Sequence, residues 1–268
     1  MKARFTALLL PFLLTFQLAG CTAVRQQLGQ TLITPETEAQ LGEQVATQVE
    51  EQEKILKDRR IQEYVRRIAT PLIEQSLLDR PGVPYRITVL DQPQQVNAFA
   101  VPGGHLYVYT GLLLAADDEA ELAGVLAHEI GHVVARHSAN QLATQYGMEI
   151  LAGLALGENP NEIAQIASQF GHAGVMARFS RDDEREADEY GVKYLVATGY
   201  DPAGLLSFFQ KLQKLEGRKQ GEVEKLLATH PATQERIRRI EKLIAKSGAQ
   251  GGDRKREQFV RETALLRR

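Results

Sequence analysis

The chain has 268 residues, a quarter of them charged, which suits one compact domain with a core of useful size. Its formal net charge is only -2, and basic residues alternate with acidic ones along most of the sequence. This balance excludes a nucleic-acid binder that depends on a basic surface. Tryptophan is absent and aromatic residues are sparse, whereas Ala, Leu, Glu, Gln and Arg are abundant, so we expect a mainly α fold.

The N-terminus has the layout of a secretory signal. Two basic residues precede an apolar run over 5–18 that is too short to span a bilayer comfortably. Small residues then lead to Cys21, the only cysteine of the chain, in a pattern that looks like the lipobox of bacterial lipoproteins. We therefore predict a signal peptide over 1–20 and a lipid anchor at Cys21; an ordinary cleaved signal with an incidental cysteine is the alternative. Thr22 follows the cysteine rather than an aspartate, which by resemblance to sorting in two-membrane bacteria favours the outer membrane, facing the periplasm.

The next part of the chain is expected to combine helices with a small sheet. Thr34 and Pro35 form a helix-start signal, and the helical pattern continues to about residue 75 with an interruption at Pro71. The periodicity then changes to that of short strands, which we expect over 85–90, 96–100 and 105–109, with a turn at 102–104. The predicted fold class is mainly α with a small antiparallel β-sheet (α+β).

Beyond residue 110 the pattern is helical. Asp118 and Glu121 predict a capping box at the start of the next helix. The small-residue-rich stretch 141–176 predicts a helical pair, broken at 157–160, that packs over the site. Later helices are expected from about 181, after 202, and from about 231 to 246.

The C-terminal end differs in composition from the rest. Residues 247–252 are predicted to be a flexible linker, and 254–268 a basic helix that is solvated or frayed. A membrane-surface role for that helix is a weaker alternative, because its apolar face is thin. The predicted organisation is therefore a domain over 21–246, followed by a linker and tail over 247–268.

Two histidines four residues apart carry the sharpest chemical signal. His128 and His132, in the segment His-Glu-Ile-Gly-His, project from the same side of a helix and can bind one zinc ion. Glu129 lies beside them and can accept a proton from a metal-bound water. The alternative is a chance match on an amphipathic helix. Catalytic zinc usually has three protein ligands, so a further donor is expected.

The acidic segment 180–190 supplies candidates for the third ligand. Glu184 and Asp188 are one helical turn apart and share a face, which suits one carboxylate on zinc and another that supports a ligand histidine. Glu186 points elsewhere. Taken alone, this segment would be interpreted as a solvated helix face. The upstream histidines reverse that preference.

Five motifs, in their order and spacing, resemble the HtpX-like and CAAX-prenyl-protease-like gluzincins, metallopeptidase family forty-eight. The motifs are Asn97 to Gly104, Tyr109 to Leu113, His128 to His132, Glu184 to Asp188, and Thr229-His230-Pro231 with Arg236-Ile237. The resemblance is closest to exported periplasmic members, because the membrane-spanning segments of the other types and the tandem helical repeats of some relatives are missing here. It implies a gluzincin metallopeptidase fold with an HExxH active-site helix.

The same resemblance implies roles for several residues. Glu184 is the implied third zinc ligand, and Asp188 orients a ligand histidine. His230 matches a histidine that relatives can place on the open zinc position, which shuts the enzyme; a helix-start histidine before Pro231 is the alternative. The edge on which an extended substrate lies is implied to be Asn97, Ala98, Phe99 and Ala100. A plain hairpin is the alternative for that strand, and we assign no role to His105 or His137.

The function that follows is that of a zinc-dependent metalloendopeptidase with one Zn²⁺ per chain. An extended-strand site needs a locally unfolded substrate, so unfolded or misassembled cell-envelope proteins are the expected partners, which amounts to protein quality control. The main alternative is a latent, metal-containing chaperone-like or binding module with little proteolysis. A weaker one is a metal hydrolase with a non-peptide substrate, favoured only if the strand at Asn97 is inaccessible.

Overall fold

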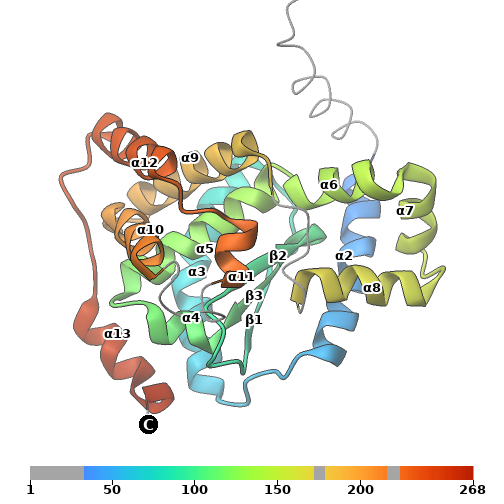
Figure 1. Ribbon diagram of the computed structural model, residues 1–268, viewed down its shortest axis with the longest axis horizontal. Coiled ribbons are helices and arrows are strands. Elements are labelled where there is room, and N and C mark those ends of the chain that lie inside the picture. The colour runs from blue at the N-terminus through green and yellow to red at the C-terminus, as the bar shows by residue number, and fades with distance from the viewer. Residues whose placement is uncertain (1–32, 172–178, 216–223, 268) are drawn as a thin grey trace, which may run out of the picture.

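The computed structural model describes residues 33–171, 179–215 and 224–267. This part of the chain is mainly helical and contains one three-stranded sheet, as predicted (Figure 1). The predicted signal and Cys21 lie outside the described residues. Within them, no helix is both long and apolar enough to cross a membrane.

The sheet is mixed. Its strands β1 (Arg86–Leu90), β2 (Ala98–Val101) and β3 (His105–Tyr109) lie in the order β1-β3-β2. The expectation of antiparallel pairing holds for β2 and β3 but not for β1, which pairs parallel with β3. After β1 the chain crosses to the far edge, and the turn η1 (Pro102–Gly104) brings it back through the middle. Positive φ angles of 79° and 93° at the two turn glycines explain why glycine stands there.

The two faces of the sheet support separate hydrophobic clusters. Val89, Ala98 and Val108 point into the larger one, whereas Leu90, Phe99 and Tyr107 point into the smaller one. This alternation follows from the two-residue period of a strand. Because both faces are covered, every residue of β2 and β3 is buried.

Two helices precede the sheet. Thr34 caps α2 (Pro35–Gln52) by accepting a hydrogen bond from the Thr37 backbone N–H at 3.1 Å, as its sequence predicts. The second helix, α3 (Arg59–Asp79), continues through Pro71, so this proline does not interrupt the helix. Ile68 and Leu72 are buried on either side of it, and their packing holds the helix together there.

The central helix is α5 (Glu119–Val134), which follows the short α4 (Thr110–Ala115) and is buried along its whole length. It packs against α3, α9 (Arg181–Ala197) and α10 (Ala203–Leu215) (Figure 1). Gly124 permits the close approach to α10, because a Cβ atom there would lie 2.8 Å from the Leu205 Cα. The predicted capping box is half formed: Asp118 accepts from the Glu121 N–H at 3.0 Å, but the Glu121 carboxylate accepts from the Asp117 N–H.

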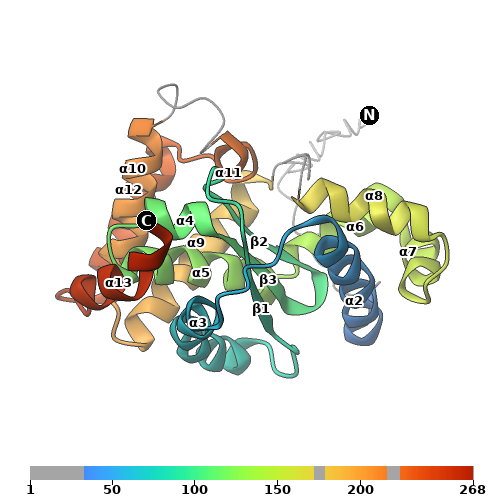
Figure 2. The same ribbon diagram turned by 90° about the horizontal axis from the view of Figure 1, so that it is seen from below.

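The helices α6 (His137–Tyr146), α7 (Met148–Ala155) and α8 (Pro160–Gly171) follow α5, and residues 172–178 of the predicted pair lie outside the described part. The break before residue 160 is confirmed, but the described helices of this pair do not pack over the site as expected. Both α7 and α8 pack against α2, on the opposite side of the molecule from the C-terminus (Figure 2). Their apolar residues, such as Leu151 and Ile166, complete the smaller hydrophobic cluster with Leu41.

The C-terminal region contains α11 (Glu224–Thr229), α12 (Gln234–Ser247), α13 (Arg256–Thr263) and the 3-10 turn η2 (Ala264–Arg267). Residues 256–263 form a helix as expected, but one face of this helix is buried against the domain. Phe259 is fully buried in the larger cluster, and the Arg254 carbonyl accepts from the Glu119 N–H in the first turn of α5. The tail therefore packs onto the domain.

Candidate metal centre

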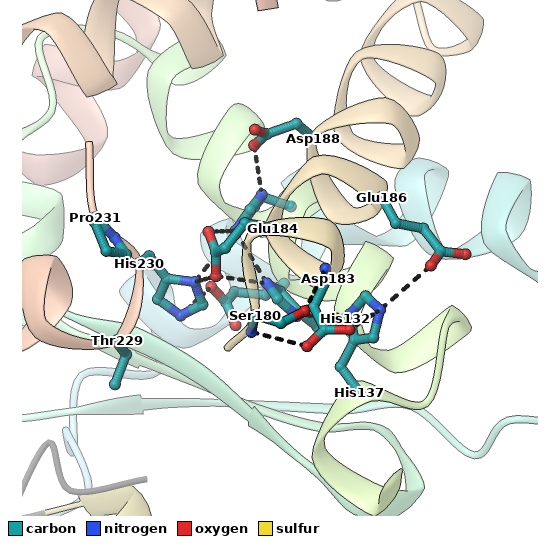
Figure 3. Close-up of polar contacts among 12 residues, drawn as sticks. His132, His137, Ser180, Asp183, Glu184, Glu186, Asp188, Thr229, His230 and Pro231 are labelled. Carbon is teal, nitrogen blue, oxygen red and sulfur yellow. Dashed lines mark hydrogen bonds and ion pairs between the residues drawn. The ribbon is translucent and has the colours of Figure 1, made fainter. Parts of the chain in front are cut away.

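Four buried side chains from distant parts of the chain converge at the middle of the molecule. His128 and His132 come from α5, Glu184 from α9, and His230 from the residue after α11. One ligand atom from each lies within 4.8 Å of all the others, and we call these four residues the metal cluster (Figure 3). Imidazole nitrogens and one carboxylate are the donors that suit a transition-metal ion such as zinc.

The two histidines of α5 aim the same ring atom at one point. The Nε2 atoms of His128 and His132 are 3.1 Å apart, and each lies 3.6 Å from an oxygen of Glu184. Burial, followed by the neighbouring histidines, lowers the pKa of His132 well below its ordinary value, so its ring is neutral. A neutral imidazole has a free lone pair for a cation. The donor set therefore fits a bound metal ion.

The far side of His128 is held by a carboxylate. Its Nδ1 lies 3.1 Å from Oδ1 of Asp188, one turn after Glu184 on α9. Arg236 of α12 donates to both oxygens of Asp188, at 2.9 and 2.6 Å, and also pairs with Glu184. Burial alone would raise the pKa of Asp188, but Arg236 and His128 outweigh it and lower the pKa. The buried carboxylate is thus charged and can orient the His128 ring.

Glu184 is also charged despite its burial. Burial would raise the pKa of its carboxyl group, but the nearby His230 and Arg236 lower it overall. The start of α9 is fixed locally by a complete capping box, in which Ser180 and Asp183 each accept from the other's backbone N–H. Glu184 is therefore presented in the first turn of a well-anchored helix.

Glu129 and His230 face each other across the cluster. Oε1 of Glu129 lies 3.5 Å from Nε2 of His230, whose Nδ1 lies 2.8 Å from Glu184 and 3.3 Å from His128. Burial raises the pKa of Glu129, which moves this carboxylate towards the range of a useful general base. Burial would lower the pKa of His230, but the carboxylates of Glu184 and Glu129 raise it.

Of the predicted substrate strand, Asn97 directly precedes β2 and Ala98 to Ala100 form its start, at the edge of the sheet. The Tyr109 N–H donates to the Asn97 carbonyl, so Asn97 and Phe99 turn their backbone groups towards β3. Ala98 and Ala100 consequently turn theirs away from β3, although both residues are buried. The Ala100 carbonyl already accepts a hydrogen bond from the Ser138 hydroxyl at 3.1 Å.

The family model for peptidase family M48 matches residues 56–244, which is more than half of the chain and includes the whole metal cluster. The chain belongs to peptidase family M48. This confirms the family resemblance inferred from the five sequence motifs.

Relatives of this chain include proteins named as metalloendopeptidases. This chain is 31% identical over 185 residues to the mitochondrial metalloendopeptidase OMA1 of Schizosaccharomyces pombe, and the match covers 68% of this chain and 52% of the relative. It is 28% identical over 211 residues to the beta-barrel assembly-enhancing protease of Escherichia coli K12, covering 75% and 42%. Metalloprotease YcaL of the same organism is 34% identical over 154 residues, covering 56% and 59%. The M48 chain thus spans about half the length of these relatives.

Three residues of the M48 site had no role in the sequence analysis. Arg236 pairs with the carboxylates of Glu184 and Asp188, and Phe179 stacks on the His132 ring with centroids 4.1 Å apart. His137 contacts His132 from α6. Only Arg236 lies in one of the five family motifs, and no local sequence pattern indicates the contacts of Phe179 and His137. Glu186, expected to point elsewhere, lies on the side of His137 and away from the metal cluster (Figure 3).

Proposed function

We propose that this M48 chain is a zinc-dependent metalloendopeptidase in which His128, His132 and Glu184 hold the metal. The observation that carries the proposal is the buried convergence of these donors next to Glu129. Zinc at this point would supply a Lewis acid that activates water and polarises a peptide carbonyl. Glu129 accepts the proton of the attacking water and delivers it to the leaving nitrogen.

The side chains around the metal donors fix their orientation and their charge. Asp188 orients the His128 ring, and Arg236 keeps the carboxylates of Asp188 and Glu184 charged in a buried place. Charged carboxylates and neutral imidazoles are the forms that bind a metal ion. Proton transfer is thereby left to Glu129, whose pKa burial raises.

We further propose that substrates are unfolded or misassembled cell-envelope proteins that pair with β2. The backbone groups of Ala98 point away from β3, which supports extended pairing of a peptide at this edge. A peptide that also paired with the Ala100 carbonyl would replace the hydrogen bond from Ser138. A folded protein cannot offer such a segment without local unfolding. The name of the Escherichia coli relative, a beta-barrel assembly-enhancing protease, supports an envelope context. Attachment to the outer membrane through acylated Cys21 completes the proposal.

His230 favours a second candidate, a latent or chaperone-like module. Its ring lies inside the metal cluster, 2.8 Å from Glu184 and 3.3 Å from His128. In that position it would occupy the coordination site that a peptidase keeps for water. This geometry fits two kinds of protein: a peptidase in which His230 can move off the metal, and a protein in which His230 blocks the metal permanently. A measurement of proteolytic activity distinguishes them.

The experiment that tests the proposed function compares wild type with Glu129→Gln. Zinc content is measured after gel filtration, and cleavage of casein is measured on the same samples. We expect equal zinc in both proteins and a loss of hydrolysis by about 10²- to 10⁴-fold in the variant, because the substitution removes the base without touching a ligand. Wild-type hydrolysis by Glu129→Gln would overturn the mechanism. Zinc-loaded wild type without hydrolysis would favour the closed module.

A further inference from the structure

His137 is a buried histidine that the proposed mechanism does not use. It is the first residue of α6, directly after Arg136, which has a φ of 61°. This left-handed residue turns the chain sharply at the end of α5, so that α6 starts beside the metal cluster. The side chain of His137 is 1% exposed.

The ring of His137 lies between the metal cluster and the start of α9. Its Nδ1 is 2.9 Å from Nδ1 of His132, the ring atom on the opposite side from the Nε2 that faces the cluster. Its Nε2 is 3.4 Å from a carboxylate oxygen of Asp183 and 3.4 Å from one of Glu186 (Figure 3). His137 therefore connects a predicted ligand to two carboxylates.

The positions of the protons in this chain follow from the chemistry of imidazole. A metal on Nε2 of His132 leaves the ring proton on Nδ1, so that this nitrogen must donate. Nδ1 of His137 must then accept, which places the proton of His137 on Nε2. The nearest carboxylate oxygens to that nitrogen belong to Asp183 and Glu186, each 3.4 Å away, and neither forms a direct hydrogen bond with it. The contact between the two Nδ1 atoms therefore determines the tautomers of both rings once a metal is bound to Nε2 of His132.

The two ligand histidines of α5 are thus supported in different ways by the same helix. Asp188 of α9 contacts Nδ1 of His128 directly, at 3.1 Å. Nδ1 of His132 is contacted instead by His137, whose Nε2 lies 3.4 Å from Asp183 and from Glu186, both earlier on α9 than Asp188. Phe179 packs on the face of the His132 ring but has no acceptor for its N–H. The hydrogen-bond partner of the His132 Nδ1 is therefore His137.

We propose that His137 is a positioning residue: it accepts the Nδ1 proton of His132 and so holds this ring in the tautomer and orientation that bind the metal. The inference rests on the proposed zinc site. Hydrogen-bonded partners of ligand histidines raise ligand basicity and fix the ring, and their loss typically weakens metal affinity by about 10- to 100-fold. A histidine that merely filled the core would have no such effect.

The test uses two substitutions of similar size on the full chain. His137→Asn places an amide oxygen near the former Nδ1 and keeps an acceptor, whereas His137→Leu fills the space without one. Zinc dissociation constants are measured by competition with a chromogenic chelator, and urea unfolding of the metal-free proteins reports on the fold. We expect the Leu variant to bind zinc about 10- to 100-fold more weakly, and the Asn variant to recover most of the affinity.

A measurement on the wild type keeps the inference testable if the Leu variant does not fold. Nitrogen-15 chemical shifts of the zinc-loaded protein report which ring nitrogen of each histidine carries the proton. His137 is expected as the neutral Nε2–H tautomer and His132 with its proton on Nδ1. A protonated Nδ1 on His137, or equal zinc affinity of folded Leu and wild-type proteins, would overturn the inference. Wild type that binds no zinc would instead defeat the proposed function.

Discussion

Glu184 and Glu186 are two residues apart on α9, yet their side chains serve different places. Glu184 is buried in the metal cluster, where its oxygens lie near three imidazole rings. Glu186 is 3.4 Å from His137, behind the cluster, and is partly exposed. A helix turns by 100° per residue, so this separation follows directly from their spacing. The pair offers a matched test of the proposed third ligand.

We predict that Glu184→Gln lowers zinc occupancy, because a neutral amide is a poor ligand for zinc. Glu186→Gln carries the same chemical change and should leave zinc in place, since Asp183 still faces His137. The measurement is the zinc content of both variants after dialysis against a weak chelator. If only Glu186→Gln loses zinc, the third ligand is Glu186 and not Glu184.

His230 leads to a prediction about latency. If its imidazole contacts the metal, His230→Ala should raise basal proteolysis while His128, His132 and Glu184 keep the zinc. Glu184 and Glu129 raise the pKa of His230, so mild acid should protonate it early and weaken its contact with a metal ion. Wild-type activity per bound zinc should therefore approach that of the variant as the pH falls from neutral to mildly acidic.

Casein cleavage by both proteins across that pH range checks this prediction, with zinc content as the control at each point. At lower pH the ligand histidines themselves are at risk, so only samples that retain zinc are compared. A folded, zinc-loaded variant that is no more active than wild type at any pH would show that His230 is a helix-start residue and not a latch.

How far the sequence predicted the site depends on the range of the contacts. His128 and His132 share a helix face, as do Glu184 and Asp188, so local periodicity was enough to group each pair. Arg236 contacts Asp188 from 48 residues away. Such a contact is set by how α12 packs on α9, which no local pattern encodes. Its place in the site became visible only in the folded chain.

At the scale of elements, α13 shows the same difference between a local pattern, which could be predicted, and a long-range contact, which could not. Its helical pattern was predicted, but the partner of its one large buried residue was not. Phe259 packs 6.3 Å from the Tyr64 ring of α3, and the preceding residues contact the start of α5. Lys255 and Arg254 also pair with Glu119 and Asp118 at that helix start. The tail therefore closes the end of the active-site helix that lies opposite to the metal cluster.

We predict that Phe259→Ala destabilises the protein by about 3–5 kcal/mol, the usual cost of removing a buried aromatic ring. Val260 is the neighbouring residue on the same helix and is 47% exposed, so Val260→Ala is a matched control with an expected change within about 0.5 kcal/mol. Urea unfolding of the metal-free proteins measures both. Equal, small effects would mean that the tail is solvated in solution.

The sheet and the helical pair mark the limits of prediction for the fold. Alternation and turn residues placed β3 and the connection correctly and β2 to within two residues, since the strand expected over 96–100 lies at 98–101. The parallel partner of β1 could not be predicted, because the hairpin pattern does not tell which strand lies in the middle. In the same way, the apolar faces of α7 and α8 indicated burial but not that α2 would cover them.

At the scale of the whole molecule, the metal cluster joins parts of the chain that lie far apart in the sequence. Its donors span from residue 128 to residue 230, and they come from α5, α9 and the segment after α11. A bound ion would therefore fix the mutual positions of these elements. The larger hydrophobic cluster supports all three from behind, so the donors need little rearrangement to receive a metal.

The remaining prediction concerns how the whole molecule is attached to a membrane. A net charge of -2 gives the chain little attraction to anionic lipid, so membrane attachment is expected to depend on the acyl chains at Cys21. Each buried methylene contributes about 0.8 kcal/mol, and this hydrophobic contribution is insensitive to screening by salt. Wild type should therefore stay in the membrane fraction through a high-salt wash. Cys21→Ser should lose lipid labelling and be either released or retained with an uncleaved signal. Labelling that survives in the variant, or wild type that washes off in salt, would refute the anchor.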